Sequence, residues 1–296
     1  MNKRNLGILL MLLSAFSFAC MQIVVKLSSG TIPLMEQVFV RNIISLSVAF
    51  FLIKKSKVSV FGEKKYQPSL FARSFFGFIG VIFLFYASSH ANQADVTILN
   101  KMSPFLITIF ATMFLGEKLS KMQIPALLIA FGGAFLVANP KFNSNMFPLI
   151  MAFLSAVASG VAYTLLSYFK NKVNGLTVIM HFSTFSMVAS VPFIIGNFVV
   201  PTGSDLITLI LIGVFGSLGQ IALTYSYRLV PASEVSIYNY SGILFSMILG
   251  YVVLNQKVGI NSLIGGSIVV LASFMVYWYN NNKRENENDE GTKKFA

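Results

Sequence analysis

The sequence DVTILN at residues 95–100 returns as EVSIYN at residues 234–239, 139 positions further along the chain. The likeness runs without a gap through residues 75–137 and 214–276. Within it, Gly77, Gly80 and Tyr86 fall on Gly216, Gly219 and Tyr225. The loop sequence GEKL at 116–119 falls on NQKV at 255–258. LSA also occurs at both 13–15 and 154–156. An internal repeat of this length indicates two similar structural units.

The composition indicates that much of the chain lies in lipid. Apolar residues make up 55% of it and charged residues 11%, whereas a soluble domain carries about 25% charged residues. A folded chain of this size cannot hide that apolar surplus in one core. The net charge of +12 comes from basic residues in short loops between apolar segments, a pattern of membrane topology, so we expect no nucleic-acid partner. The single cysteine, Cys20, excludes an intramolecular disulfide.

Ten apolar segments are predicted as membrane helices: 6–27, 34–53, 69–88, 94–115, 122–138, 146–169, 176–199, 205–227, 232–254 and 259–279. Each is close to the roughly 20 residues that a helix needs to cross a bilayer. Helices are expected because lipid leaves no partner for an open backbone. The first segment is not predicted as a signal peptide, since its apolar run continues past Cys20 and further segments follow.

The loop charges predict the orientation. With both termini inside, most of the 22 lysines and arginines lie in inner loops and tails, whereas the outer loops carry only Lys141 and Lys257. The positive-inside rule therefore places both termini in the cytoplasm of a multi-pass protein of the cell membrane. Five spans per half make the second half an inverted copy of the first, the architecture of many secondary transporters. The predicted units are residues 1–139, residues 140–279 and a disordered tail, 280–296.

Two motifs carry a family resemblance. FVRN at 39–42 lies in the second span, and LGEKLS at 115–120 lies between the fourth and fifth spans. Together with the doubled five-span pattern, they resemble the EamA branch of the drug/metabolite transporter superfamily. The resemblance implies a ten-helix carrier with a central cavity open alternately to either side, and relatives that move amino acids, cofactors, vitamins, amines and drugs, many by export. Asn255 and Gln256 depart from the usual Gly-Glu of the motif.

Polar residues inside membrane helices are candidates for function because they are costly there. Asn100 and Asn239 are repeat mates and are predicted near the midplane, where they would contact a polar substrate. The alternative is an interhelical hydrogen bond that holds the halves together. Lys101 is predicted to contact a substrate anion or to pair with Glu36. A cavity wall of aromatic and amide groups is predicted from Tyr86, Tyr163, Tyr225, Tyr238, Tyr240, Gln22 and Gln220.

Five further residues are candidates for coupling or gating. Asp95 and Glu234, also repeat mates, would carry a coupling proton or meet a cationic substrate; the alternative is a charge favoured at a helix N-terminus. Arg41 would act at the substrate or gate, or instead hold the fold by bonding backbone carbonyls or by pairing with Glu36, which is itself one of the five candidates. His181 is a candidate proton site, with a buried neutral histidine as the alternative.

The remaining features concern packing. Arg73 is predicted to snorkel to the cytoplasmic edge. The four repeated glycines are predicted to let helices approach closely. Pro104 is predicted to kink the fourth span, and because its mate is Ile243, the ninth span is predicted to be straighter.

These patterns predict a secondary active transporter rather than an enzyme, with no cofactor and no metal site, since nucleotide-binding and metal motifs are absent from the sequence. The predicted cargo is a small polar metabolite, amino-acid-like, zwitterionic or an amine, moved by alternating access and exported. Protons are the candidate coupling ion, lipid surrounds the protein, and a monomer and a dimer both remain open. The alternative is a polytopic membrane enzyme or a flippase acting on a lipid-linked substrate.

Overall fold

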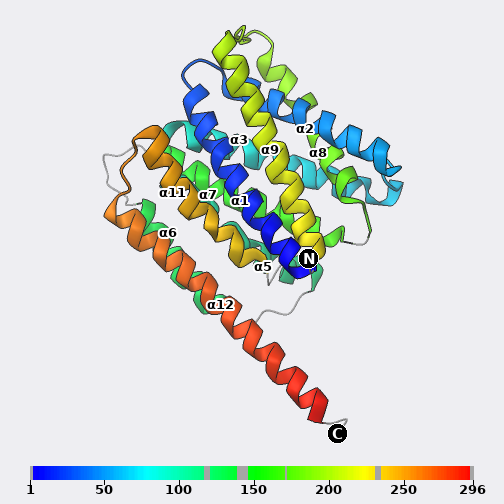
Figure 1. Cartoon of the computed structure of the whole chain (residues 1–296), viewed down its shortest axis with the longest axis vertical. Helices are drawn as coiled ribbons and strands as arrows, with labels where there is room; N and C mark the ends of the chain where they lie inside the picture. The colour runs from blue at the N-terminus through cyan, green and yellow to red at the C-terminus, as the bar shows by residue number, and fades with distance from the viewer. Residues whose placement is uncertain (1–2, 117–120, 139–145, 171, 231–234, 294–296) are drawn as a thin grey trace.

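The computed structural model describes residues 3–116, 121–138, 146–170, 172–230 and 235–293, and these residues form helices and no strand (Figure 1). The first half contains α1 (Lys3–Ser28), α2 (Leu34–Ser56), η1 (Lys64–Tyr66), α3 (Gln67–His90), α4 (Gln93–Asn100), α5 (Ser103–Leu115) and α6 (Gln123–Ala138). The second half contains α7 (Phe147–Tyr168), α8 (Gly175–Ile194), α9 (Gly203–Leu229), η2 (Ser236–Tyr240), α11 (Ser241–Leu254) and α12 (Ile260–Lys293). The loop motif beyond Gly116, the outer-loop Lys141 and the candidate Glu234 lie outside the described residues.

The predicted class, an all-helical membrane protein, is confirmed. Eight of the described helical segments are long and apolar enough to cross a membrane. Two shorter apolar segments, Ile124–Val137 and Tyr238–Leu254, occupy the places of the fifth and ninth predicted spans. Many large apolar side chains on the outer faces are exposed, such as Met113, Phe135 and Ile248. Such apolar surfaces are unfavourable in water and would be covered by the lipid of a bilayer.

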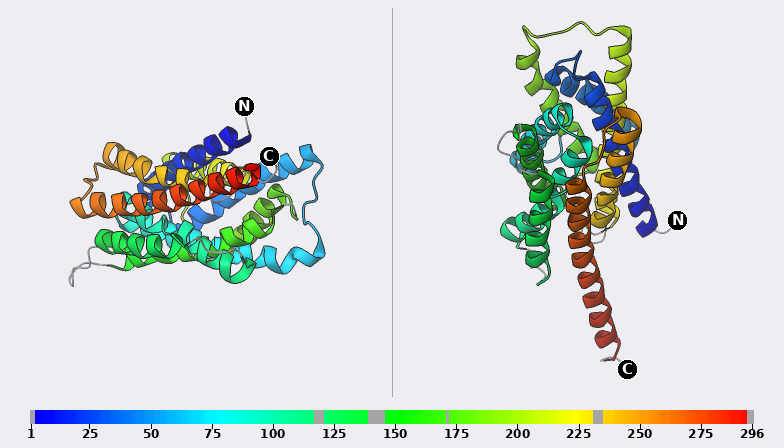
Figure 2. Two further views of the ribbon diagram at one scale, coloured as in Figure 1. Left: turned by 90° about the horizontal axis from the view of Figure 1, so that it is seen from below. Right: turned by 90° about the vertical axis from the view of Figure 1, so that its left-hand side faces the viewer.

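The two halves pack against each other reciprocally. The first helix of each half lies along the third helix of the other, α1 on α9 and α7 on α3. The second helices pack together, α2 on α8, and the last ones do the same, α6 on α12. Figures 1 and 2 show α1 and α9 side by side, and α12 alongside α6. Exchange of the halves therefore leaves the contact pattern unchanged, as in an assembly with two-fold symmetry.

One hydrogen bond occurs twice in this arrangement. The Ser14 hydroxyl in α1 donates to the carbonyl of Gly219 in α9 at 2.8 Å. The Ser155 hydroxyl in α7 donates to the carbonyl of Gly80 in α3 at 2.9 Å. Both serines belong to the repeated LSA sequence, and both glycines are repeat mates. A glycine at each position keeps the helices close: a Cβ on Gly80 would lie 3.3 Å from Ala158, and one on Gly219 would lie 2.9 Å from the Phe18 ring. The predicted close approach is observed at this pair.

The helices α6 and α12 cross at two glycines. A Cβ built on Gly133 would lie 2.7 Å from the carbonyl oxygen of Gly265, and one built on Gly265 would collide with the backbone carbonyl of Gly133. Small residues at a membrane helix crossing allow this backbone contact. The neighbouring Gly132 has open space around it, so the tight requirement applies to one face of α6 only.

Both the fourth and the ninth spans are interrupted near their centres. In the first half, α4 ends at Asn100 and α5 begins at Ser103, with Pro104 in its first turn. Proline has no N–H to donate to the preceding turn, which explains the break. In the second half, η2 ends at Tyr240, the repeat mate of Lys101, before α11 begins. The prediction of a straighter ninth span was wrong: the Ser241 hydroxyl donates to the Tyr238 carbonyl at 2.6 Å, and such local bonds compete with the regular helix.

Hydrogen bonds connect the loops and helix ends into two groups, one at each end of the bundle. At one end of the bundle, Thr31 donates to Asp205 at 2.7 Å and Asn92 donates to the Lys257 carbonyl at 3.2 Å. At the other end, Thr177 donates to the Ser59 carbonyl at 2.5 Å and Arg228 donates to the Val173 carbonyl at 3.0 Å. Each bond joins segments that the loop charges predict on the same side of the membrane.

The C-terminal segment differs from the prediction of a disordered tail from residue 280. The backbone of α12 remains helical to Lys293 and projects beyond the bundle (Figures 1 and 2). An existing helix extends at a much lower cost than a new one forms, and residues 280–293 contain no proline that would end it.

Candidate functional site: a central cationic cavity

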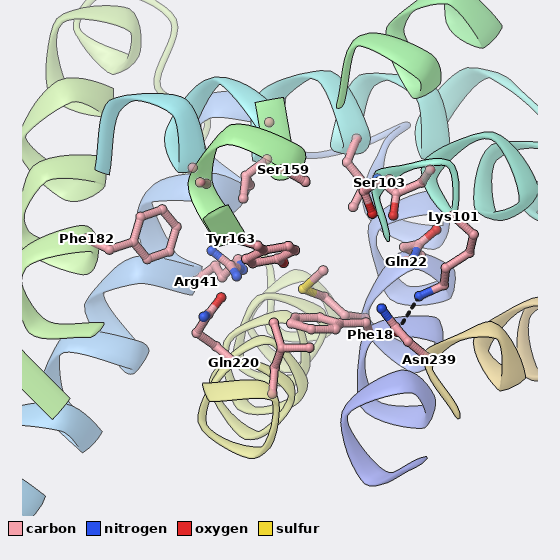
Figure 3. Close-up of a pocket in the computed structure, with 18 of the residues that line it drawn as sticks. Phe18, Gln22, Arg41, Lys101, Ser103, Ser159, Tyr163, Phe182, Gln220 and Asn239 are labelled. Atoms are coloured by element: carbon pink, nitrogen blue, oxygen red, sulfur yellow. Dashed lines mark hydrogen bonds between the residues drawn. The ribbon is translucent and has the colours of Figure 1, made fainter. Parts of the chain in front are cut away.

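A cavity of about 70 Å³ lies at the centre of the bundle, between the two halves. Helices α1, α2, α3, α7, α8 and α9 supply its wall, together with the breaks that follow α4 and η2. Its polar lining residues are Gln22, Arg41, Arg73, Asn100, Lys101, Ser103, Ser159, Tyr163, Gln220 and Asn239. Figure 3 shows most of them pointing toward one another from different helices. Polar groups that converge in an apolar wall are typical of a small-molecule site.

One end of the cavity is built on the two broken spans. Lys101 follows α4, and its side chain is 7% exposed. Its ammonium donates to the amide oxygen of Asn239 at 2.7 Å (Figure 3). Each residue comes from the break in its own half, so the hydrogen bond joins the two halves at their centre. An ammonium group has three N–H donors, and this is the one hydrogen bond that the Lys101 ammonium makes with the described residues.

Asn100 and Asn239 line the same cavity but have different partners. The Asn100 amide donates to the Ser155 hydroxyl at 3.0 Å, and that hydroxyl donates in turn to Gly80. Asn239 accepts from Lys101. Each asparagine therefore makes an interhelical hydrogen bond and also lines the cavity. Contact of the pair with a substrate stays a prediction.

The other end of the cavity contains two arginines. Arg41 from α2 and Arg73 from α3 are each 2% exposed. The guanidinium carbons lie 5.7 Å and 4.3 Å from the centre of the Phe182 ring. Tyr163 also lines this end, as Figure 3 shows for Tyr163 beside Arg41. Stacking on an aromatic ring supports a guanidinium without neutralising its charge.

These arginines have unused hydrogen-bond donors. The Nε of Arg41 and the Nε and one terminal nitrogen of Arg73 are buried without a hydrogen-bond partner among the described residues. Arg41 makes one long contact of 3.5 Å to the Asn42 side chain. A buried donor without a partner is unfavourable, so the site as it stands lacks an acceptor.

Glycines make room for all three cations. A Cβ on Gly77 would lie 3.2 Å from a terminal nitrogen of Arg73, and a Cβ on its repeat mate Gly216 would lie 2.8 Å from Nε of Arg41. A Cβ on Gly242 would lie 3.2 Å from Nζ of Lys101. Gly77 and Gly216, which were predicted to allow close helix packing, therefore each also leave space for an arginine side chain.

The carboxylates that the structure describes lie elsewhere. Asp95, in the first turn of α4, accepts from the Ser262 hydroxyl in α12, and Asp205 accepts from Thr31 and Thr202. Glu63 pairs with Lys65 on the surface at 2.7 Å. No described carboxylate lines the cavity or forms an ion pair with its cations.

Glu36 corrects two predictions. It was the predicted partner of Lys101 and of Arg41, but its carboxylate accepts from the Val199 backbone N–H at 3.2 Å. It lies in a separate, mainly apolar pocket of about 420 Å³ between α2, α8 and α9. Five residues along a helix turn a side chain by about 140°, so Glu36 and Arg41 face different directions.

Four predicted tyrosines lie outside the cavity lining. One of them, Tyr238, packs against an apolar cluster that includes Phe169 and Tyr227. Tyr86 stacks on His90 with ring centres 4.3 Å apart. Tyr240 is buried in the apolar core beside Phe105, and Tyr225 is not among the lining residues. The 3₁₀ segment η2 places Asn239 in the cavity, and the next residue, Tyr240, packs into the core instead. His181 likewise lies beside the site, with its Nδ1 3.0 Å from the Ser74 hydroxyl.

Arg73 is the charged lining residue that the sequence analysis missed, and Ser103 and Ser159 are polar lining residues that it did not name. A snorkelling side chain would be exposed at the membrane edge, whereas Arg73 is buried at 2% exposure and lines the cavity. The sequence feature that could have indicated a buried Arg73 is Gly77, one turn further along α3. Because Gly77 has no side chain, it leaves the volume that the guanidinium occupies.

Comparison with known protein families identifies one that shares this sequence pattern. The profile of the EamA-like transporter family matches the chain twice, at residues 5–139 and 146–278. This chain belongs to the EamA-like transporter family. The resemblance drawn from FVRN, LGEKLS and the repeat is thus confirmed, and the multi-pass membrane character follows from the same match and the ten apolar segments.

Named relatives of the family are transporters. The chain is 29% identical over 268 residues to the pseudopaline exporter CntI of Pseudomonas aeruginosa, covering 90% of this chain and 94% of that protein. It is 26% identical over 285 residues to solute carrier family 35 member G1 of Mus musculus, covering 91% and 77%. A solved crystal structure superposes with a TM-score of 0.63 at 18% identity, covering 89% of this chain and 95% of that chain. The solved structure supports the fold alone.

Proposed function

We propose that this family member is a secondary carrier that moves a small organic metabolite through the central cavity by alternating access. The observation that carries the proposal is a buried polar cavity, built from both repeats, in a chain whose named relatives are transporters. The cavity of about 70 Å³ is far below the roughly 300 Å³ at which ligand pockets begin. Helices around it must separate to admit a metabolite, which is the motion that alternating access requires.

The proposed topology has two inverted five-helix units with both termini in the cytoplasm. The loop charges and the sorting of the loop hydrogen bonds into two groups support it. The cell membrane is the proposed location, and export is the proposed direction, as in the relative named as an exporter.

The substrate proposal from the sequence was an amino-acid-like or amine compound. The described lining supports the acidic half of a zwitterion, since Arg41, Arg73 and Lys101 face the cavity. The same described lining contains no carboxylate that could pair with the ammonium group of an amine. The proposed substrate class therefore moves toward metabolites that carry a carboxylate. Proton coupling through His181 stays a proposal, and His181 is not among the residues that line the cavity.

Counterflow in proteoliposomes tests the carrier. Vesicles loaded with unlabelled succinate, alanine or choline should accumulate the same radiolabelled compound for at least one of the three probes. Asn239→Ala should slow that exchange by about tenfold or more, because it removes the acceptor that positions Lys101. A steady conductance without exchange would indicate a channel, and chemical conversion of a probe would indicate an enzyme; either result would refute a carrier.

A further inference from the structure

The cationic groups of the cavity are divided between its two ends. In Figure 3, Arg41 lies with Tyr163 toward one side and Lys101 lies with Asn239 toward the other. Arg73 belongs to the first end, because its guanidinium stacks on the Phe182 ring 4.3 Å from its centre. The site therefore has a double guanidinium end and a single ammonium end.

Each end has donors that the described residues do not use. Three guanidinium nitrogens are buried without a partner at the arginine end. At the other end, the Lys101 ammonium makes one hydrogen bond, to Asn239. All three side chains are more than nine-tenths buried, so bulk water does not solvate them. Buried charges of one sign are strongly unfavourable unless an opposite charge is present.

The groups between the ends are mostly apolar. The Phe18 ring of α1 lies between the two ends in Figure 3, and Met21 and Leu84 are further apolar residues of the lining. Apolar groups favour methylene carbons over a second row of polar atoms. The complementary ligand thus has an anionic group at each end and a short carbon chain in the middle.

We propose that the substrate of this carrier is a small dicarboxylate, with one carboxylate at Arg41 and Arg73 and the other at Lys101. The assignment rests on the proposed function and names its substrate class. Guanidinium groups bind a carboxylate through two parallel hydrogen bonds, which suits the end with the larger number of unused donors. An ammonium with an amide beside it binds the second carboxylate as a point charge. A single carboxylate would leave one end without a counter-charge.

Ligand binding to the purified, full-length protein in detergent tests this directly. The probes are the dicarboxylates from malonate to adipate, each paired with a monocarboxylate of equal carbon number, with alanine, choline and chloride for comparison. Thermal stabilisation should peak at one dicarboxylate length. The matched monocarboxylate should bind at least about tenfold more weakly, equivalent to about 1.4 kcal/mol.

Variants assign the two ends. Arg73→Gln and Lys101→Gln should each weaken dicarboxylate binding about tenfold or more and should reduce the preference over the matched monocarboxylate. Arg73→Lys retains the charge and should restore part of the affinity. The control is Lys55→Gln, an exposed lysine at the end of α2, which should bind as the unmodified protein does.

The outcomes separate the substrate class from the carrier. Equal binding of dicarboxylates and monocarboxylates, or the best binding by alanine, choline or chloride, would overturn the two-ended anion site while exchange still supported a carrier. Dicarboxylate binding that depends on Arg73 and Lys101, without exchange in vesicles, would uphold the site and refute transport. No stabilisation by any dicarboxylate would overturn the inference.

Discussion

At Ser14 and Ser155, one hydroxyl makes the same contact in each half of the molecule, to the carbonyls of Gly219 and Gly80. Membrane helices have little hydrophobic drive to associate, so such bonds and close packing hold them together. The two contacts are nearly equal in length and burial. The Ser155 hydroxyl also accepts from the Asn100 amide at 3.0 Å, so its removal should have the larger effect.

Ser14→Ala should lower the stability of the folded protein by about 1 kcal/mol, the usual net value of such a hydrogen bond. Ser155→Ala should lower it by more, because it also leaves the Asn100 amide without its acceptor. Thermal unfolding in detergent measures the loss. Ser47→Ala is the matched control, since the Ser47 hydroxyl bonds only within its own exposed helix turn. A loss for Ser47→Ala as large as for the buried pair would contradict this account.

Arg73 offers a second prediction at this scale. Its side chain makes no hydrogen bond with the described residues, and two of its nitrogens are buried and unpaired. Replacement of an unpaired buried charge by an apolar group of similar length is often neutral or stabilising. Arg73→Met should therefore unfold in ligand-free detergent at the same or a higher temperature than the parent. A clear drop in the unfolding temperature would mean that Arg73 supports the fold rather than a ligand.

At the scale of elements, the crossing of α6 and α12 depends on Gly133 and Gly265, whose backbones touch. Gly133→Leu should separate the two helices and reduce the fraction of folded protein in size-exclusion chromatography, because the added side chain would collide with the Gly265 carbonyl and with Ile268. Gly132→Leu, one residue earlier and facing open space, should fold normally. If both variants behave alike, the crossing is not the cause.

The two broken spans are the other decisive elements. Their breaks fall at repeat-equivalent positions although only one contains a proline, and they deliver Lys101 and Asn239 to the same point. Continuous helices would leave the backbone fully paired, whereas a break exposes polar groups that are tolerated where they line a cavity.

At the scale of the whole molecule, the reciprocal packing of the halves leads to a topology prediction. In a Cys20→Ser background, Gly30→Cys and Gly203→Cys lie in loops that the loop charges place outside, and Lys172→Cys lies in a loop predicted inside. A membrane-impermeant thiol reagent should label the first two in intact cells and the third only after permeabilisation. Labelling of Lys172→Cys in intact cells would reject the inverted arrangement.

The sequence determined the helical membrane class, the positions of the spans and the family, because hydropathy and an internal repeat are local properties that survive without a structure. It also selected Asn100, Asn239, Lys101, Arg41, Tyr163, Gln22 and Gln220, which line the cavity, since polar residues inside apolar spans are visible in one dimension.

Only the tertiary structure decided which of these groups meet. Periodicity along one helix does not define the direction of a side chain relative to five other helices. For this reason the sequence analysis predicted the wrong partners for Glu36, placed Arg73 at the membrane edge and assigned Tyr86 to the cavity wall. The division of Arg41, Arg73 and Lys101 between two ends, without a carboxylate among the described lining residues, arises from packing between the halves. That separation depends on how both repeats fold against each other, a relation that no single span contains.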